Sequence, residues 1–246
     1  MSRSHPGSAP RILSNDDGEG DDIGTGLDAW LRAVAAYPKG AVVTLAAGYI
    51  SFHGLMRLAG SVRTLNRAGV PVRILFGVAP TGSAAVSYDA EESIVRLRRL
   101  LADGEDALDE ELEALDVSSE AAAQLADLVD VLRDPLVQVR RYERGFFHAK
   151  AFVVKPVGRP AEVVVGSCNL TRAGLSSNIE LAVAAGREEA EEAARRVVDW
   201  WRASKPYDLV GMIEERFATY PAALVYLRML AERFAHEVDP TQSPLG

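Results

Sequence analysis

The fold of this 246-residue chain is decided by residues 148–181, which read HAKAFVVKPVGRPAEVVVGSCNLTRAGLSSNIEL. This stretch contains three short apolar runs with the composition of buried strands, at residues 152–154, 163–165 and 181–183. Polar side chains stand directly beside the runs, namely His148, Lys150, Ser167, Asn169 and Glu180. The stretch therefore predicts neighbouring strands that bring together a nucleophile, a cation, an amide and a carboxylate, as phosphoryl transfer requires.

His148 is the candidate nucleophile, because a neutral imidazole can attack phosphorus and split one difficult displacement into two easier ones. Lys150 lies two residues on, so strand alternation places its ammonium on the same face, where it would hold a nonbridging phosphate oxygen. Asn169 and Ser167 offer further donors to these oxygens. We expect Glu180 to accept a hydrogen bond from the far ring nitrogen of His148 and so to fix its tautomer. These five residues form the predicted catalytic set.

Each motif residue also has a purely structural interpretation. A lone histidine beside a strand is more often a satisfied core residue, and Lys150 alone would be an ordinary solvated charge. Gly166 would permit a tight turn, and Asn169 would cap a loop over residues 171–177. Cys168 suggests a Cys–His hydrolase, but strand alternation turns it away from its neighbours. The order of the whole set favours the functional interpretation.

The order of these residues resembles the phospholipase D superfamily, whose signature is H-x-K-x4-D followed by G-S/G-x-N and a downstream acidic residue. The resemblance is closest to the nuclease branch, on the run GSCNLTRAGLSSNIEL at residues 166–181. Lys155 stands where the signature has aspartate, a residue that is mainly supporting in this superfamily and that some nucleases lack. The resemblance implies metal-independent phosphodiester hydrolysis without a cofactor, and a role in a restriction or phage-defence system.

A leaving oxygen needs an acid, and one copy of the motif supplies one histidine. The other histidines, His5, His53 and His236, lie outside any second copy of the motif. A two-fold axis beside His148 would allow one imidazole to attack while its protonated symmetry mate donates. Single-copy members of the resembling family act as homodimers. We therefore predict a homodimer with its active site at the two-fold interface.

Charge is distributed unevenly along this chain of net charge −8. Residues 138–172 carry seven basic residues against two acidic ones, the basic ones being Arg140, Arg141, Arg144, Lys150, Lys155, Arg159 and Arg172. Such a local excess is typical of a phosphate-binding surface and favours DNA as the substrate. The predicted substrate-binding residues are Gly166, Arg172 and Arg144, together with Tyr49 and Ser51, which the resemblance places at the cleft rim beside His53.

The expected fold class is α/β, a phospholipase D-like mixed sheet flanked by helices. A strand at 41–50, a helix at 53–67 and a strand at 72–78 predict a right-handed β-α-β unit with parallel strands. Further strands are expected at 136–142 and 179–185, and a helix at 27–36. We expect the domains to be a flexible tail over 1–22, a catalytic domain over 23–186 with an acidic helical insertion at about 85–134, and a helical extension over 187–246. That extension contains helices at 188–203, where Trp200 and Trp201 serve as core or dimer contacts, and at 224–234.

The composition excludes several classes of protein and of site. One cysteine excludes an internal disulfide framework, and no run is long enough to span a membrane, so we expect a cytoplasmic protein. No Cys/His cluster or paired-carboxylate spacing indicates a metal. Two rival functions remain open: a noncatalytic nucleic-acid-binding subunit of a larger complex, and a hydrolase of lipids or small phosphodiesters.

Overall fold

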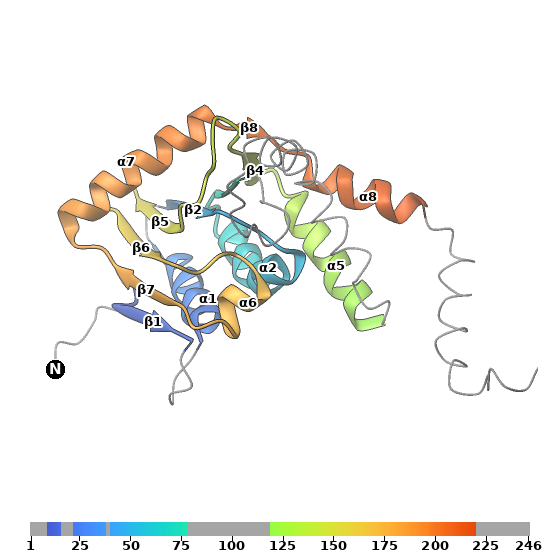
Figure 1. Ribbon diagram of the computed structural model, residues 1–246, viewed down its shortest axis with the longest axis horizontal. Coiled ribbons are helices and arrows are strands. Elements are labelled where there is room, and N and C mark those ends of the chain that lie inside the picture. The colour runs from blue at the N-terminus through green and yellow to red at the C-terminus, as the bar shows by residue number, and fades with distance from the viewer. Residues whose placement is uncertain (1–8, 16–21, 38–39, 78–118, 220–246) are drawn as a thin grey trace, which may run out of the picture.

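The computed structural model describes residues 9–15, 22–37, 40–77 and 119–219. Within these ranges the chain forms an eight-stranded mixed sheet with the order β1-β7-β6-β5-β2-β3-β4-β8 (Figure 1). The strands are β1 Ile12–Ser14, β2 Ala41–Ala47, β3 Val72–Phe76, β4 Val137–Arg141, β5 Ala151–Pro156, β6 Glu162–Gly166, β7 Leu181–Ala184 and β8 Lys205–Pro206. Strands β2, β3 and β4 are parallel, and the other neighbours are antiparallel.

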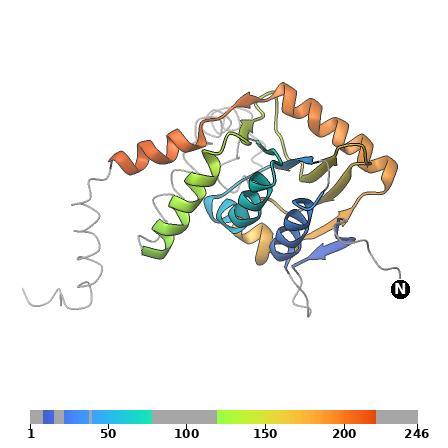
Figure 2. The same cartoon turned by 180° about the vertical axis from the view of Figure 1, so that it is seen from behind.

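Helices cover both faces of the sheet. They are α1 Ile23–Val34, α2 Phe52–Arg67, α5 Ser119–Leu132, α6 Arg172–Ser176, α7 Arg187–Ala203 and α8 Leu209–Thr219. Helices α1 and α2 pack on one face, and α7 runs across the other (Figures 1 and 2). The predicted α/β class, a mixed sheet flanked by helices, is therefore confirmed.

Strand β5 shows why the central strands read as apolar runs. Phe152 and Val154 belong to the core under α1 and α2, whereas Val153 belongs to the core under α7. Burial on both faces removes the polar alternation of a half-exposed strand. Strand β5 runs antiparallel to β2, with Ala151 opposite Ala46. The segment before β5, which carries His148 and Lys150, therefore lies where β2 ends.

The predicted β-α-β unit is present as β2, α2 and the parallel strand β3. Ser51 is the N-cap of α2, and its Oγ accepts a hydrogen bond from the Gly54 backbone N–H at 3.1 Å. Gly54 is required at this helix start because a Cβ there would lie 2.1 Å from the Leu170 carbonyl oxygen. This close contact ties the end of β2 to the residues that follow Asn169.

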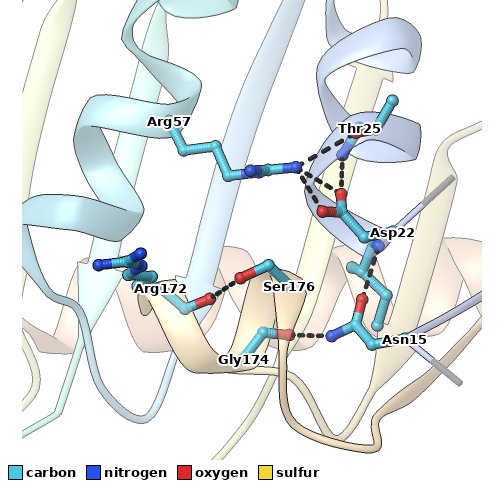
Figure 3. Close-up of polar contacts among 8 residues, drawn as sticks. Asn15, Asp22, Thr25, Arg57, Arg172, Gly174 and Ser176 are labelled. Carbon is cyan, nitrogen blue, oxygen red and sulfur yellow. Dashed lines mark hydrogen bonds and ion pairs between the residues drawn. The ribbon is translucent and has the colours of Figure 1, made fainter. Parts of the chain in front are cut away.

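The expectation of a flexible tail over residues 1–22 does not hold for residues 12–15. Strand β1 pairs with β7 at the edge of the sheet, with Ile12 opposite Val183. Buried Asn15 then joins three segments: its Nδ2 donates to the Gly174 carbonyl at 2.9 Å, and its Oδ1 accepts from the Ile23 N–H at 2.8 Å (Figure 3). A three-residue strand that pairs with a distant segment leaves too short a pattern to recognise in the sequence.

We expect Asn15→Ala to destabilise the protein by about 2–4 kcal/mol, because it leaves the buried Ile23 N–H and Gly174 C=O without partners. Urea unfolding followed by circular dichroism measures the change. Ser176→Ala, which removes a local exposed hydrogen bond to the Arg172 carbonyl, is the control and should stay within about 0.5 kcal/mol. An unchanged Asn15→Ala variant would show that residues 12–15 are a tail after all.

Other differences concern short or peripheral elements. Residues 172–176 form the helix α6, with Thr171 as its N-cap, where we expected a loop. Strand β8 and helix α8 were not expected, and α7 packs on the sheet in the core that includes Val163 and Trp201. The expected insertion lies outside the described residues except for α5, as does the expected helix at 224–234. None of the helices in the described ranges is long and apolar enough to cross a membrane.

Candidate active site

His148 and Lys150 lie together at the start of β5. The Lys150 ammonium is 2.8 Å from Nδ1 and 2.9 Å from Nε2 of His148, and it donates to the His148 carbonyl oxygen at 3.0 Å. The Lys150 side chain is buried, with 8% exposed, whereas the His148 residue is exposed. The pair therefore presents a reachable imidazole backed by a fixed positive charge.

This arrangement favours the neutral form of the imidazole. Partial burial lowers the pKa of His148 below its ordinary value, and the Lys150 charge lowers that pKa further. Burial also lowers the pKa of Lys150, while the charge of Glu180 acts in the opposite direction. A neutral ring nitrogen is the form of histidine that can attack phosphorus.

Asn169 approaches the same place from the end of β6. Its Oδ1 accepts a hydrogen bond from the Tyr49 backbone N–H at 3.1 Å, so the amide NH₂ is the end that can donate to a substrate. The adjoining backbone is held too, because Leu170 N–H donates to the Tyr49 carbonyl and Ser51 N–H donates to the Leu170 carbonyl. The segment after β2 thus orients the amide beside His148.

Gly48 separates the two motif segments and was not among the predicted site residues. A Cβ at this position would lie 3.2 Å from Cα and 3.2 Å from ring Cδ2 of His148, and 3.3 Å from Oδ1 of Asn169. In the sequence, a glycine at the end of a strand indicates only a turn. The close approach of Gly48 to His148 depends on the register of β2 and β5, which only the structure shows.

Gly48→Ala should lower kcat/KM for phosphodiester cleavage by about 3- to 30-fold, since the new methyl group must displace His148 or Asn169 by a few tenths of an ångström. Steady-state kinetics with bis(p-nitrophenyl) phosphate measures the effect. Gly145→Ala is the matched control, because no atom lies within 4 Å of a Cβ built there. Equal rates for both variants would refute the spacer role.

Ser167 and Glu180 bond to each other rather than to His148. The Ser167 hydroxyl donates to the Glu180 carboxylate and accepts from the Leu181 backbone N–H at 3.2 Å. In the described part of a single chain, Glu180 makes no hydrogen bond to the His148 ring, so the expected tautomer-fixing contact is absent within one chain. Gly166 permits the close approach of β7, because a Cβ there would be 2.4 Å from the Leu181 carbonyl oxygen.

Two aromatic rings flank the His148 imidazole. Phe146 stacks on it with ring centroids 5.3 Å apart, and Tyr49 meets it edge-on at 5.7 Å. Tyr49 was a predicted site residue, whereas Phe146 was missed although it lies two residues from His148 and is 69% exposed. The sequence signal that could have identified Phe146 is its position, as a large apolar residue in a polar segment between two strands.

The basic run of residues 138–172 does not form one surface. Four of its members already have partners: Arg140 donates to the Trp201 carbonyl, Arg141 pairs with Glu143, Lys155 pairs with Glu191 and Arg159 lies over the Tyr37 ring. Arg144 and Arg172 are exposed near the motif in the chain, and Figure 3 shows the Arg172 side chain directed away from Asn15. The expected phosphate-binding surface is thus reduced to Lys150, Arg144 and Arg172.

Lys155, in the aspartate position of the signature, lies away from the site. It shares a sheet face with Val153, under α7, and its ammonium pairs with Glu191 at 2.7 Å. Five residues of strand separate it from Lys150, a distance of about 17 Å. The replacement therefore changes a contact between β5 and α7 and leaves the surroundings of His148 unaltered.

Cys168 is fully buried, and burial raises the pKa of its thiol to about 11, so it is not poised as a nucleophile. Among the residues that the structure describes, no group of three or more His, Cys, Asp or Glu side chains could hold a metal ion. The site as described consists of the His148–Lys150 pair, the Asn169 amide and the Ser167–Glu180 pair.

The chain is similar to one family of domains and to several solved structures. The family model described as "Cardiolipin synthase, PLD-like domain" matches residues 45–201. No curated protein matches the sequence. Among solved structures, Nuc from Salmonella typhimurium, a phospholipase D family member, is 15% identical, with a TM-score of 0.45 over 80% of this chain and 96% of that one. NucT from Helicobacter pylori is 11% identical, with a TM-score of 0.43 over 80% and 97% of the two chains. Phosphatidylserine synthase from Haemophilus influenzae is 16% identical, with a TM-score of 0.43 over 92% and 45%.

Proposed function

The chain belongs to the family of PLD-like domains, and from that premise we propose that it is a metal-independent phosphodiesterase that cleaves DNA through a phosphohistidine on His148. The observation that carries the proposal is the contact of the Lys150 ammonium with both ring nitrogens of His148, at 2.8 and 2.9 Å. That contact favours the neutral imidazole and places a fixed cation where a phosphate oxygen would arrive.

In the first step a ring nitrogen of His148 forms a bond to phosphorus while the bond from phosphorus to the leaving oxygen breaks. The Lys150 ammonium and the Asn169 amide protons hold the nonbridging oxygens as their charge increases. In the second step a water molecule attacks phosphorus and the P–N bond breaks, which regenerates the imidazole. No step of this scheme requires a metal.

The proton for the leaving oxygen comes, in this proposal, from the partner subunit's His148 across a two-fold axis. That imidazole then removes a proton from the attacking water, so the pair returns to its starting state. In the proposed dimer the two imidazoles titrate as a coupled pair, one neutral and one protonated. Because Glu180 bonds Ser167 and not its own histidine, we propose that it orients the partner subunit's His148.

Exposed apolar side chains beside the motif support the homodimer. Ile179 is 90% exposed and Leu181 is 55% exposed on either side of Glu180, and Phe146 stacks on His148. Large exposed hydrophobic residues are typical of an interaction surface. A second copy placed on this surface would cover them and bring the two histidines together.

DNA is the proposed substrate because Lys150 in the site, and exposed Arg144 and Arg172 close to the motif in the sequence, suit a polyanionic backbone. The proposed setting in a restriction or phage-defence system rests on the sequence resemblance alone. The rival interpretation as a binding subunit rests on Lys155 in the aspartate position and on the acidic insertion. Lys155 pairs with Glu191 away from His148, and the insertion lies outside the described residues except for α5.

Cleavage assays in excess EDTA test this function. Purified protein should cleave single- or double-stranded DNA, and added salt should reduce cleavage steeply because the contacts are to phosphates. Turnover of phosphatidyl substrates with no action on DNA would identify a lipid hydrolase. Salt-sensitive DNA binding that survives His148→Ala, with no cleavage by the wild-type protein, would identify a binding subunit.

The acid limb of the pH profile of kcat/KM should fall below pH 6.5, the ordinary pKa of histidine. The sign follows from the lowered pKa of His148: a ring that releases its proton more readily stays neutral, and able to attack, at lower pH. Initial rates with bis(p-nitrophenyl) phosphate between about pH 4 and 9 give the profile. An acid limb at or above pH 6.5 would mean that burial and the Lys150 charge do not lower the pKa of the nucleophile.

A further inference from the structure

A cavity of about 450 Å³ lies between the sheet and α7, on the face opposite α1 and α2. Its floor comes from three adjacent strands, where Thr44 of β2 is paired with Arg73 of β3 and with Val153 of β5. The volume is that of a site for a small organic ligand. Val42 and Lys155, which pair at the far end of β2 and β5, also line the cavity. The cavity therefore lies away from His148, which precedes the other end of β5.

Arg73 lacks the partners that its neighbours have. Its guanidinium lies 5.3 Å from the centroid of the Trp201 ring, and the Arg140 guanidinium lies 5.0 Å from the same ring. Arg140 donates to the carbonyls of Trp201 and Ser204, at the end of α7. For Arg73, in contrast, the described part of the chain provides neither a carboxylate nor a carbonyl acceptor.

Like charges surround Arg73. Burial lowers its pKa, and the charges of Arg140 and Arg202 lower it further. Assembling three guanidinium groups costs free energy that a bound anion would recover. Since no carboxylate of the described residues pairs with it, the half-buried Arg73 is a candidate for anion recognition.

The charges that line the cavity are four cations, Arg73, Lys155, Arg195 and Arg202, and two acids, Glu191 and Asp199. Glu191 is already occupied, because it accepts from Lys155 at 2.7 Å and from the Ala161 N–H at 2.7 Å. Asp199 and Arg202 are 3.8 Å apart and both largely exposed, so their pairing is weak. The Arg73–Arg202 end of the cavity thus has an uncompensated positive charge.

We propose that this cavity binds an organic phosphate, with the phosphate held by Arg73 and Arg202 and the organic part lying over Val42, Val153 and Val198. Guanidinium groups match phosphate oxygens with paired hydrogen bonds. The apolar part of the lining and the volume both exceed what an inorganic ion would fill. This binding site goes beyond the proposed nuclease activity and involves no covalent step.

Isothermal titration of the full chain with 5′-dAMP, and separately with inorganic phosphate, tests the site. We expect saturable binding of 5′-dAMP and weaker binding of inorganic phosphate, which cannot contact the apolar floor. Arg73→Gln and Arg202→Gln should each weaken 5′-dAMP binding about 10- to 100-fold, the usual effect of losing a hydrogen bond to a charged group.

Arg196→Gln is the matched control, because Arg196 is on the same helix but pairs with Glu192 outside the cavity, and binding should be unchanged. Arg73→Gln should also melt at or above the wild-type temperature, since it removes a like-charge contact. The proposal is overturned by the absence of saturable binding, by equal affinity for inorganic phosphate, or by 5′-dAMP binding that survives Arg73→Gln and is lost in Lys150→Ala.

Discussion

His148→Ala should reduce phosphodiester cleavage by at least about 10⁴-fold, because it removes the atom that bonds to phosphorus and, in a homodimer, the acid as well. The same variant should fold normally. The His148 side chain is exposed, and its observed neighbours are the Lys150 ammonium and the rings of Phe146 and Tyr49. Single-turnover assays in EDTA, with thermal melting of each preparation, measure both quantities.

Chemical rescue separates a missing nucleophile from a damaged site. Free imidazole should restore part of the activity of His148→Ala, because it can enter the space that the side chain has left. It should restore none in Lys150→Ala, where the histidine remains and the oxygen-binding cation is lost. If His148→Ala kept more than about one hundredth of the wild-type rate, the nucleophile would have to be another group.

Ile179→Asp should convert the dimer to a monomer and lower cleavage by about 100-fold or more, although it changes no residue of the proposed chemistry. The reason is that Ile179 is 90% exposed in one chain and sits beside Glu180, on the surface proposed to meet the second copy. A carboxylate buried there would lack a partner in the dimer. Light scattering after gel filtration gives the mass, and the DNA cleavage assay gives the rate.

Val157→Asp is the control for Ile179→Asp. Val157 is also largely exposed, at 59%, but it follows β5 at the end of the strand remote from His148. Val157→Asp should leave the mass and the rate unchanged. If the added negative charge alone weakened DNA binding, both variants would lose activity. A fully active monomeric Ile179→Asp variant would refute the shared active site.

The sequence was sufficient to predict the motif and the central strands. The spacing of His148, Lys150 and Asn169 is local, and burial on both faces makes β5 and β6 read as unbroken apolar runs. The two-residue spacing predicted that His148 and Lys150 share a face, and the two side chains are in contact although both residues precede β5. Such patterns depend only on residues that are close in the sequence, which is why they could be predicted without the structure.

Contacts that depend on register or on distant segments could not be read in the same way. Strand β1 exists because it pairs with β7, and Gly48 matters because β2 and β5 align so that its missing Cβ makes room for His148. The basic run looked like one surface, yet Arg140 points to the end of α7 and Lys155 to Glu191, 36 residues further along. Because side chains alternate between the two faces of a strand, Arg140 and Lys155 lie on the α7 face of the sheet. Their closeness to the motif in the sequence therefore does not predict a position near His148.

The phosphohistidine is tested most directly by quenching turnover of DNA in excess EDTA within the first turnover and mapping the modified residue by mass spectrometry. We expect one cleaved strand to be joined through its terminal phosphate to a ring nitrogen of His148 by an acid-labile P–N bond, absent from His148→Ala and trapped in proportion to active dimer. Metal-free turnover with a phosphoryl group on another residue, such as Ser167, or with none at all in the first turnover, would contradict it.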